Sequence, residues 1–139
     1  MKFLSYSIVL LVLVGCTRQI QQDDLVHLNG YWEIELVESA TKKIKKYSVN
    51  TTVDYFSIDA KGNGFRKKTK SDFSGKYKAN HIKDTLHVIF RGDEVILQTK
   101  TPYDSWEETI VKLTAKKLIL KNNKGILFHY KKHQKYNLK

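Results

Sequence analysis

The stretch Leu28-Asn-Gly-Tyr-Trp-Glu-Ile-Glu-Leu36 decides the fold. Its apolar side chains Trp32, Ile34 and Leu36 occupy every second position and alternate with two glutamates. Successive side chains of a strand point to opposite faces, so this pattern predicts a β-strand with one buried face. Trp32, Ile34 and Leu36 are expected to share that buried face.

The same period of two continues along the rest of the chain. Residues 52–58 and 65–70 predict two strands joined by a loop at 59–64, and the Asn/Gly-rich segment 122–125 predicts another hairpin. The pattern indicates eight to ten short strands and no helix longer than two turns. A sheet of this many antiparallel strands exposes edges that invite aggregation unless it closes. We therefore predict an all-β, antiparallel up-and-down barrel.

Composition sets further bounds on the class of protein. The chain has 139 residues, 41% of them hydrophobic, a single cysteine and a formal net charge of +11. This length supports one domain. A single cysteine excludes an internal disulfide and any multi-cysteine metal site.

The first sixteen residues have the layout of a sorting signal. Lys2 precedes an apolar run over residues 3–14, which is too short to span a bilayer, and Leu13-Val14-Gly15-Cys16 follows. This ending resembles the lipobox of bacterial lipoproteins. The resemblance implies a signal peptide over 1–15, removed from the mature chain, and fatty acylation of Cys16, for which palmitate is a label. An ordinary signal with a chance cysteine and a short membrane anchor remain alternatives.

The lipobox resemblance also implies a location. Residue 17 is threonine and not aspartate, which by resemblance to the sorting rule of Gram-negative lipoproteins favours the outer membrane of the cell envelope. Residues 16–27 then form a lipidated N-terminus and tether, with one short helical turn at 25–28 capped by Asp24. The barrel domain is expected over 28–132, and residues 133–139 form a basic tail.

The chain is also similar to lipocalin-like domains of small bacterial lipoproteins. The similarity lies in the Gly30-Tyr-Trp32 opening and in the closing stretch from Ile110 to Lys131. It implies a barrel with a central cavity that holds small, often hydrophobic molecules. It further implies that Trp32 packs at the closed end beneath a basic residue near the last strand, for which Lys132 is the candidate.

Strand parity selects candidate cavity residues. They are Trp32, Ile34, Phe56, Arg66, Tyr77, Phe90 and Trp106. Either the row that holds Arg66 or the row that holds Lys67 must face inward, and an inward Arg66 would suit an anionic ligand such as a fatty acid. Glu108 shares the parity of Trp106, and if buried it needs a partner, for which Arg66 or Lys68 is available.

No catalytic signature is present in the sequence. We find no nucleophile elbow, phosphate-binding loop or zinc motif, so we expect neither an enzyme nor a cofactor nor a metal. His129 and His133 are four residues apart, but the segment alternates like a strand, and we interpret them as an exposed pair.

Two functions from different classes remain open. The first is a membrane-anchored binding module that takes a small apolar or anionic amphipathic ligand. The second is an envelope scaffold or interaction lipoprotein that uses basic clusters, such as Lys42-Lys43-Ile44-Lys45-Lys46, to contact anionic lipid or glycan. In both cases the partner is a bilayer reached through acylated Cys16, nucleic acid is not expected, and the chain is expected to be a monomer.

Overall fold

The computed structural model describes residues 18–48, 50, 52–71, 76–79 and 81–134. Within these ranges the chain forms one 3₁₀ helix, η1 (Gln22–Leu28), and ten strands, in line with the predicted eight to ten. The strands are β1 (Gly30–Glu38), β2 (Ile44–Lys46), β3 (Thr52–Ile58), β4 (Asn63–Ser71), β5 (Tyr77–Ala79), β6 (Asp84–Arg91), β7 (Glu94–Lys100), β8 (Ser105–Leu113), β9 (Lys117–Lys121) and β10 (Leu127–Lys132).

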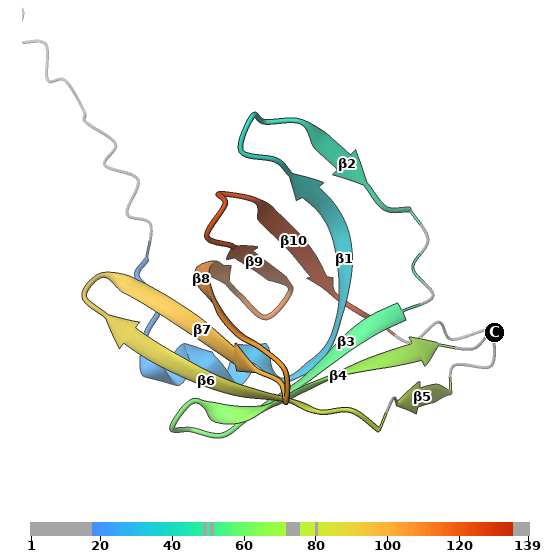
Figure 1. Ribbon diagram of the computed structural model, residues 1–139, viewed down its shortest axis with the longest axis horizontal. Coiled ribbons are helices and arrows are strands. Elements are labelled where there is room, and N and C mark those ends of the chain that lie inside the picture. Colours follow the sequence, from blue (N-terminus) through green and yellow to red (C-terminus); the bar gives the residue numbers. More distant parts are fainter. Residues whose placement is uncertain (1–17, 49, 51, 72–75, 80, 135–139) are drawn as a thin grey trace, which may run out of the picture.

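Eight of these strands form a closed antiparallel barrel (Figure 1). Pairing runs through β1, β3, β4, β6, β7, β8, β9 and β10 in chain order, and β10 pairs back onto β1. The two remaining strands lie off this ring, β2 on the end of β1 and β5 on the end of β4. The predicted fold class, an all-β antiparallel up-and-down barrel, is confirmed.

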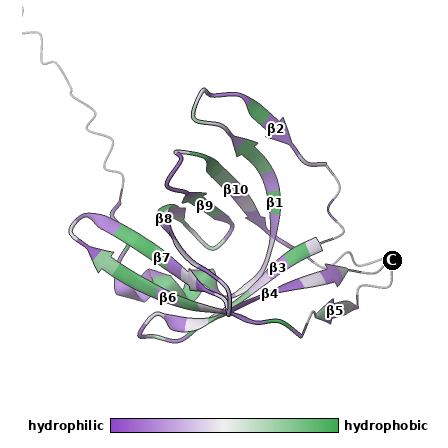
Figure 2. Ribbon diagram, viewed as in Figure 1, coloured by the Kyte–Doolittle hydropathy of each residue, from purple (hydrophilic) through white to green (hydrophobic). Residues whose placement is uncertain are grey.

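The apolar core fills the end of the barrel where β1 begins, which we call the closed end. In Figure 2, β7 carries a continuous hydrophobic stretch, whereas β4 is largely hydrophilic. The inward side chains Trp32, Phe56, Leu86, Leu97, Leu118 and Leu120 are each at most 1% exposed. Burial of these side chains is the main force that holds the barrel closed.

Helix η1 covers this end and begins earlier than the turn expected at 25–28. It starts at Gln22, and Asp24 accepts a hydrogen bond from the Gln21 backbone N–H at 2.8 Å. Leu25 and Leu28 lie three residues apart, so in a 3₁₀ helix they project from one side. Both are buried in the core, which places residues 22–27 on the barrel although they were expected in the tether.

A β-bulge in β1 changes the expected parity. The register to β10 shifts between Ile34, which pairs with Tyr130, and Leu36, which pairs with His129. An extra residue in one strand turns the side chains beyond it to the opposite face. The expectation that Leu36 shares the face of Trp32 is therefore wrong.

The start of the expected basic tail belongs to the barrel. The His133 backbone N–H donates to the carbonyl of Tyr31 at 2.8 Å, and its Nδ1 lies 2.5 Å from Oε2 of Glu33. The His133 side chain is only 4% exposed, so its interpretation as one of an exposed pair is wrong. Residues 135–139 lie outside the described ranges.

Candidate ligand cavity

A cluster at the closed end joins the first and last strands to η1. The Trp32 indole N–H donates to the carbonyl of Leu28 at 2.8 Å, and Nζ of Lys132 lies 4.1 Å from the centre of the Trp32 ring. Lys132 also donates to the carbonyls of His27 at 3.0 Å and Asn29 at 2.5 Å. Lys132 thus fills the place expected for a basic residue above Trp32, and burial lowers its pKa.

A cavity that is open to solvent lies where β1 and β3 separate. These strands pair only through Gly30–Trp32 and Asp54–Phe56, and beyond that point a space of about 310 Å³ lies between them. Its walls are Trp32, Ile34, Asp54, Lys68 and Tyr130 from the barrel strands. Tyr47, Asn50 and Thr52, which precede or begin β3, line the rim. This volume is at the lower end of the range for small-molecule sites.

A group of polar side chains inside the barrel adjoins this cavity. It consists of Asp54, Arg66, Asp84, Thr99, Glu108 and Tyr130, and we call it the polar layer. Asp54 and Tyr130 belong both to the layer and to the cavity wall. Residues directly opposite each other on paired strands share a face, and by this register Arg66 faces inward beside Phe56 and Asp84.

Arg66 is the centre of the polar layer. Its Nη2 lies 3.6 Å from Oδ2 of Asp84. Its guanidinium carbon lies 5.8 Å from the ring centre of Phe56 and 5.9 Å from that of Trp106. Both distances allow a cation–π interaction, so Arg66 occupies a face of each ring.

Burial shifts the ionisation of the groups around Arg66. Desolvation raises the pKa of Asp54, although Arg66 and Lys68 lower it in part. Desolvation also raises the pKa of Glu108, against the opposing effects of Arg66 and of a hydrogen bond from Trp106. Burial raises the pKa of the Tyr130 phenol in the same way. Of the two partners named from sequence for Glu108, Arg66 is near enough to act on its charge, but it forms no ion pair with Glu108 among the described residues.

Three polar atoms of this layer are buried without a hydrogen-bond partner in the part of the chain that the structure describes. They are Nε of Arg66, Oγ1 of Thr99 and Oε2 of Glu108. Arg66 is 9% exposed and Thr99 is 0% exposed. Unsatisfied buried polar groups are rare, and each costs about 1–3 kcal/mol. Three of them together mark the polar layer as the candidate functional site.

The structure brings five of the seven residues predicted from parity to this region. Trp32 and Ile34 line the cavity, while Phe56, Arg66 and Trp106 form or flank the polar layer. The side chain of Tyr77 is outside the described residues, and its strand β5 lies off the ring. Cys16, the predicted acylation site, is also outside them.

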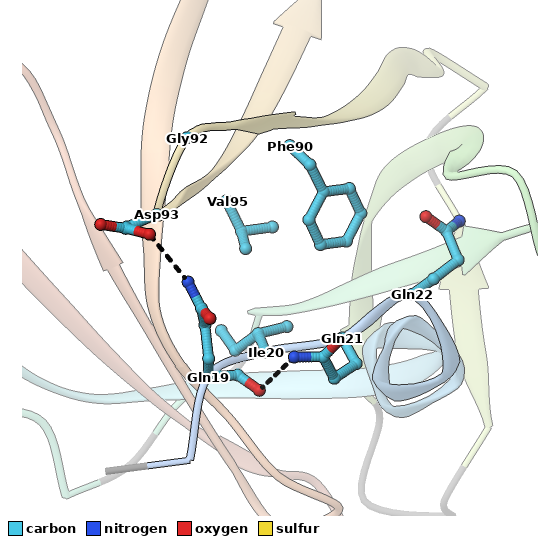
Figure 3. Close-up of a pocket in the computed structure, with 8 residues that line it drawn as sticks. All are labelled: Gln19, Ile20, Gln21, Gln22, Phe90, Gly92, Asp93 and Val95. Atoms are coloured by element: carbon cyan, nitrogen blue, oxygen red, sulfur yellow. Dashed lines mark hydrogen bonds between the residues drawn. The ribbon is translucent and has the colours of Figure 1, made fainter.

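Phe90 lies on the inner face that parity predicts, opposite the core residue Val95, but it does not line the cavity. It is 42% exposed, because β6 has reached its turn at this point and the N-terminal segment lies against the side chain. Figure 3 shows Phe90 and Val95 directed toward residues 19–22 across a hollow of about 300 Å³, with Gln19 bonded to Asp93 at 3.3 Å. A larger hollow of about 510 Å³ flanks the same segment near Val111. Ile20 packs against the core between the two hollows. Both are therefore gaps between the N-terminal segment and the barrel surface.

Sequence reasoning missed four members of the polar layer. They are Asp54, Asp84, Thr99 and Tyr130. Each has the parity of a core residue two positions away, such as Phe56 for Asp54 and Leu86 for Asp84. Parity alone would have identified them, had polar side chains been considered at interior positions.

The described residues hold no group of three or more His, Cys, Asp or Glu side chains arranged to bind a metal ion. In the same part of the chain, we find no helix with the length and apolar character required to cross a membrane.

The molecule is thus an eight-stranded up-and-down barrel with a small cavity and a buried polar layer. No protein-family model and no curated protein matches the sequence. Two solved structures are similar. A lipocalin-like protein from Bacteroides uniformis is 15% identical, with 77% of this chain and 99% of that chain covered and a TM-score of 0.49. An uncharacterized protein from Bacteroides eggerthii is 16% identical, with 76% and 99% covered and a TM-score of 0.49.

Proposed function

We propose that this chain is a membrane-anchored binding lipoprotein of the bacterial cell envelope, whose barrel holds a small hydrophobic or amphipathic molecule. The observation that carries the proposal is the cavity of about 310 Å³ beside the polar layer. Aromatic walls at Trp32 and Tyr130 next to convergent polar groups are the usual composition of a small-molecule site. The role is binding and not catalysis.

The anchor in this proposal is Cys16. Its support is the sequence alone, in the apolar run followed by Leu13-Val14-Gly15-Cys16. One acyl chain holds a protein only marginally at a membrane, so stable attachment needs two or more. Labelling with radioactive palmitate should mark the wild-type chain and leave Cys16→Ser unlabelled. Equal labelling of both chains would contradict the anchor.

The cavity is tested with an apolar fluorescent probe. N-phenyl-1-naphthylamine should bind the full chain with an increase in fluorescence, and Ile34→Trp should reduce its affinity at least about tenfold because the larger ring fills the cavity. Thr52→Trp at the rim provides a second variant in case the first does not fold. If the variants fold and still bind the probe as tightly as wild type, the proposal is overturned.

Val111→Trp is the matched control. Val111 lies on the outside of β8 and is 49% exposed. The same ring added there leaves the cavity open, so probe affinity should stay at the wild-type value. An equal loss in this variant would show that the probe reads surface hydrophobicity.

A second function is favoured by a different observation. Lys42, Lys43, Lys45 and Lys46 are all exposed and project from the β1–β2 turn and from β2. Such a cluster attracts an anionic lipid or glycan surface, with about 1 kcal/mol per lysine before screening by salt. In this reading the chain is an interaction lipoprotein that works through its outer surface.

Charge reversal separates the two functions. Replacing these four lysines with glutamate should abolish sedimentation of the chain with anionic vesicles at low salt, and wild-type sedimentation should fall as salt rises. Unchanged sedimentation of the variant would remove this second function. Probe binding in the cavity should be unaffected by the reversal.

A further inference from the structure

The charge inside the barrel argues against an anionic ligand. Of the two rows of β4 that could face inward, the structure has the one that holds Arg66. Its guanidinium, however, already pairs with Asp84 at 3.6 Å. Asp54 and Glu108 add two further carboxyl groups that interact with the same arginine. Lys68, opposite Asp54 in the register, is the additional cation that faces this group, and it is exposed at the cavity wall. A ligand carboxylate would thus meet three acidic side chains around one buried arginine.

The aromatic rings argue against a cationic ligand. Aromatic walls recognise ammonium groups through their faces. Here the guanidinium of Arg66 already lies over both Phe56 and Trp106. A second cation beside Arg66 would lack these ring faces.

The atoms without hydrogen-bond partners indicate which class of ligand remains. Nε of Arg66 is a donor, Oε2 of Glu108 is an acceptor, and the hydroxyl of Thr99 can do both. Thr99 lies opposite Trp106 in the register, and Glu108 is two residues after Trp106 on the same strand. The side chains of Thr99 and Glu108 therefore share the inner face. Hydroxyl groups donate and accept at once and carry no charge, which makes them the complement of this set.

We propose that the polar layer binds the uncharged, hydroxyl-bearing head group of an amphipathic molecule. This inference rests on the proposed binding function and names its ligand class. The head group enters past Asp54 and Tyr130, accepts a hydrogen bond from Arg66 and donates to Glu108. The apolar part of the molecule lies along Ile34 and the aromatic wall of the cavity.

A series of ligands with one tail and three head groups tests this. Decyl glucoside, decanoate and decylammonium, each below its micelle concentration, are titrated into the full chain while tryptophan fluorescence is recorded. Trp32 and Trp106 are the two tryptophans of the chain and both lie at this region, so binding should change their emission. We expect decyl glucoside to bind at least about tenfold more tightly than either charged ligand.

Two substitutions locate the head group. Glu108→Gln and Thr99→Val should each weaken decyl glucoside by about tenfold at nearly constant side-chain volume. Thr99→Val removes a hydroxyl that bonds the ligand, and Glu108→Gln replaces a carboxylate acceptor with a weaker, uncharged one. Glu107→Gln is the control. Glu107 is the neighbour of Glu108 on β8, but it is exposed and pairs with Arg91, so binding should be unchanged.

Each remaining outcome has a definite meaning. Tightest binding of decanoate or decylammonium would overturn the assignment of an uncharged head group, as would equal loss in Glu107→Gln. Binding of N-phenyl-1-naphthylamine without binding of decyl glucoside would overturn this inference and leave the proposed function standing. Failure of every ligand, the probe included, would overturn both.

Discussion

At the scale of single residues, Gly30 shows why the opening of β1 has its sequence. Its φ is +115°, which side chains with a Cβ rarely adopt, and a Cβ placed there would lie 3.3 Å from Nζ of Lys132. Lys132 has no freedom to withdraw, because it is bonded to two carbonyls and lies over Trp32. Gly30, Trp32 and Lys132 therefore depend on one another.

Gly30→Ala should lower the free energy of unfolding by about 2–3 kcal/mol, through backbone strain and displacement of Lys132. Gly92→Ala is the comparison, because its φ is +60° and no atom of the described residues lies within 4 Å of the added Cβ. It should cost only about 1 kcal/mol. Urea unfolding measures both, and equal costs would contradict the role given to Lys132.

Glu33 gives the barrel a dependence on acid. Burial raises its pKa, but hydrogen bonds from His133 and Lys131 outweigh this and the net pKa is lowered from 4.5. A carboxyl group with a lowered pKa stabilises the fold at pH values above its pKa in the unfolded chain. This stability is lost as the pH falls through its pKa in the folded chain. Glu33→Gln should cost about 2 kcal/mol at pH 7, and this difference should shrink below about pH 4.5.

Unfolding of wild type and Glu33→Gln at several pH values checks this, with exposed Glu94→Gln as the control. A difference between wild type and Glu33→Gln that is constant from neutral to acid pH would contradict the ion pair.

Glu108 is expected to act in the opposite direction. Burial raises the pKa of Glu108 in the folded chain. Its ionisation therefore opposes folding as the pH rises from the pKa of the unfolded chain through that of the folded chain. Glu108→Gln should therefore stabilise the ligand-free chain by about 1 kcal/mol at neutral pH and have no effect in acid. Thermal unfolding at the two pH values measures this, and destabilisation at neutral pH would contradict the assignment.

At the scale of elements, helix η1 is the part of the barrel that sequence patterns described least well. Residues 17–24 are polar and aperiodic, which is typical of a tether, and a short 3₁₀ helix leaves only Leu25 and Leu28 as its signal. Both leucines are buried, so η1 belongs to the domain and not to the linker.

Leu25→Ala should therefore cost about 2–4 kcal/mol, the usual loss for a core leucine. Val26→Ala, one residue along the same helix and 62% exposed, should change stability by less than about 0.5 kcal/mol. Denaturant unfolding compares the two. Equal, small effects would return residues 22–27 to the tether.

The strands themselves were predictable, and the failures have local causes. Parity placed Trp32 and Phe56 on the inner face and left it to either Arg66 or Lys67 in β4, because alternation holds wherever a strand is regular. It failed for Leu36, where a bulge adds a residue. For Phe90 it gave the right face but not the distance from the cavity, because the strand ends there. Neither a bulge nor a strand end can be seen in the alternation of hydrophobic residues.

At the scale of the whole molecule, the barrel divides into an apolar closed end and a polar layer beside the cavity. The closed end supplies the burial that holds the fold, from η1 and Trp32 to Leu120. The polar layer holds charged groups whose burial opposes folding, notably Asp54 and Glu108. Such a layer is understandable if it binds a ligand, since functional sites are where local rules of stability are broken.

Native mass spectrometry of the full chain carrying Cys16→Ser, purified from the cells that produce it, tests the central claim most directly. The account predicts a bound small molecule in the spectrum of this chain and its absence in the cavity-filling Ile34→Trp derivative. A spectrum with only the bare chain, together with no uptake of any added amphipathic molecule, would contradict it.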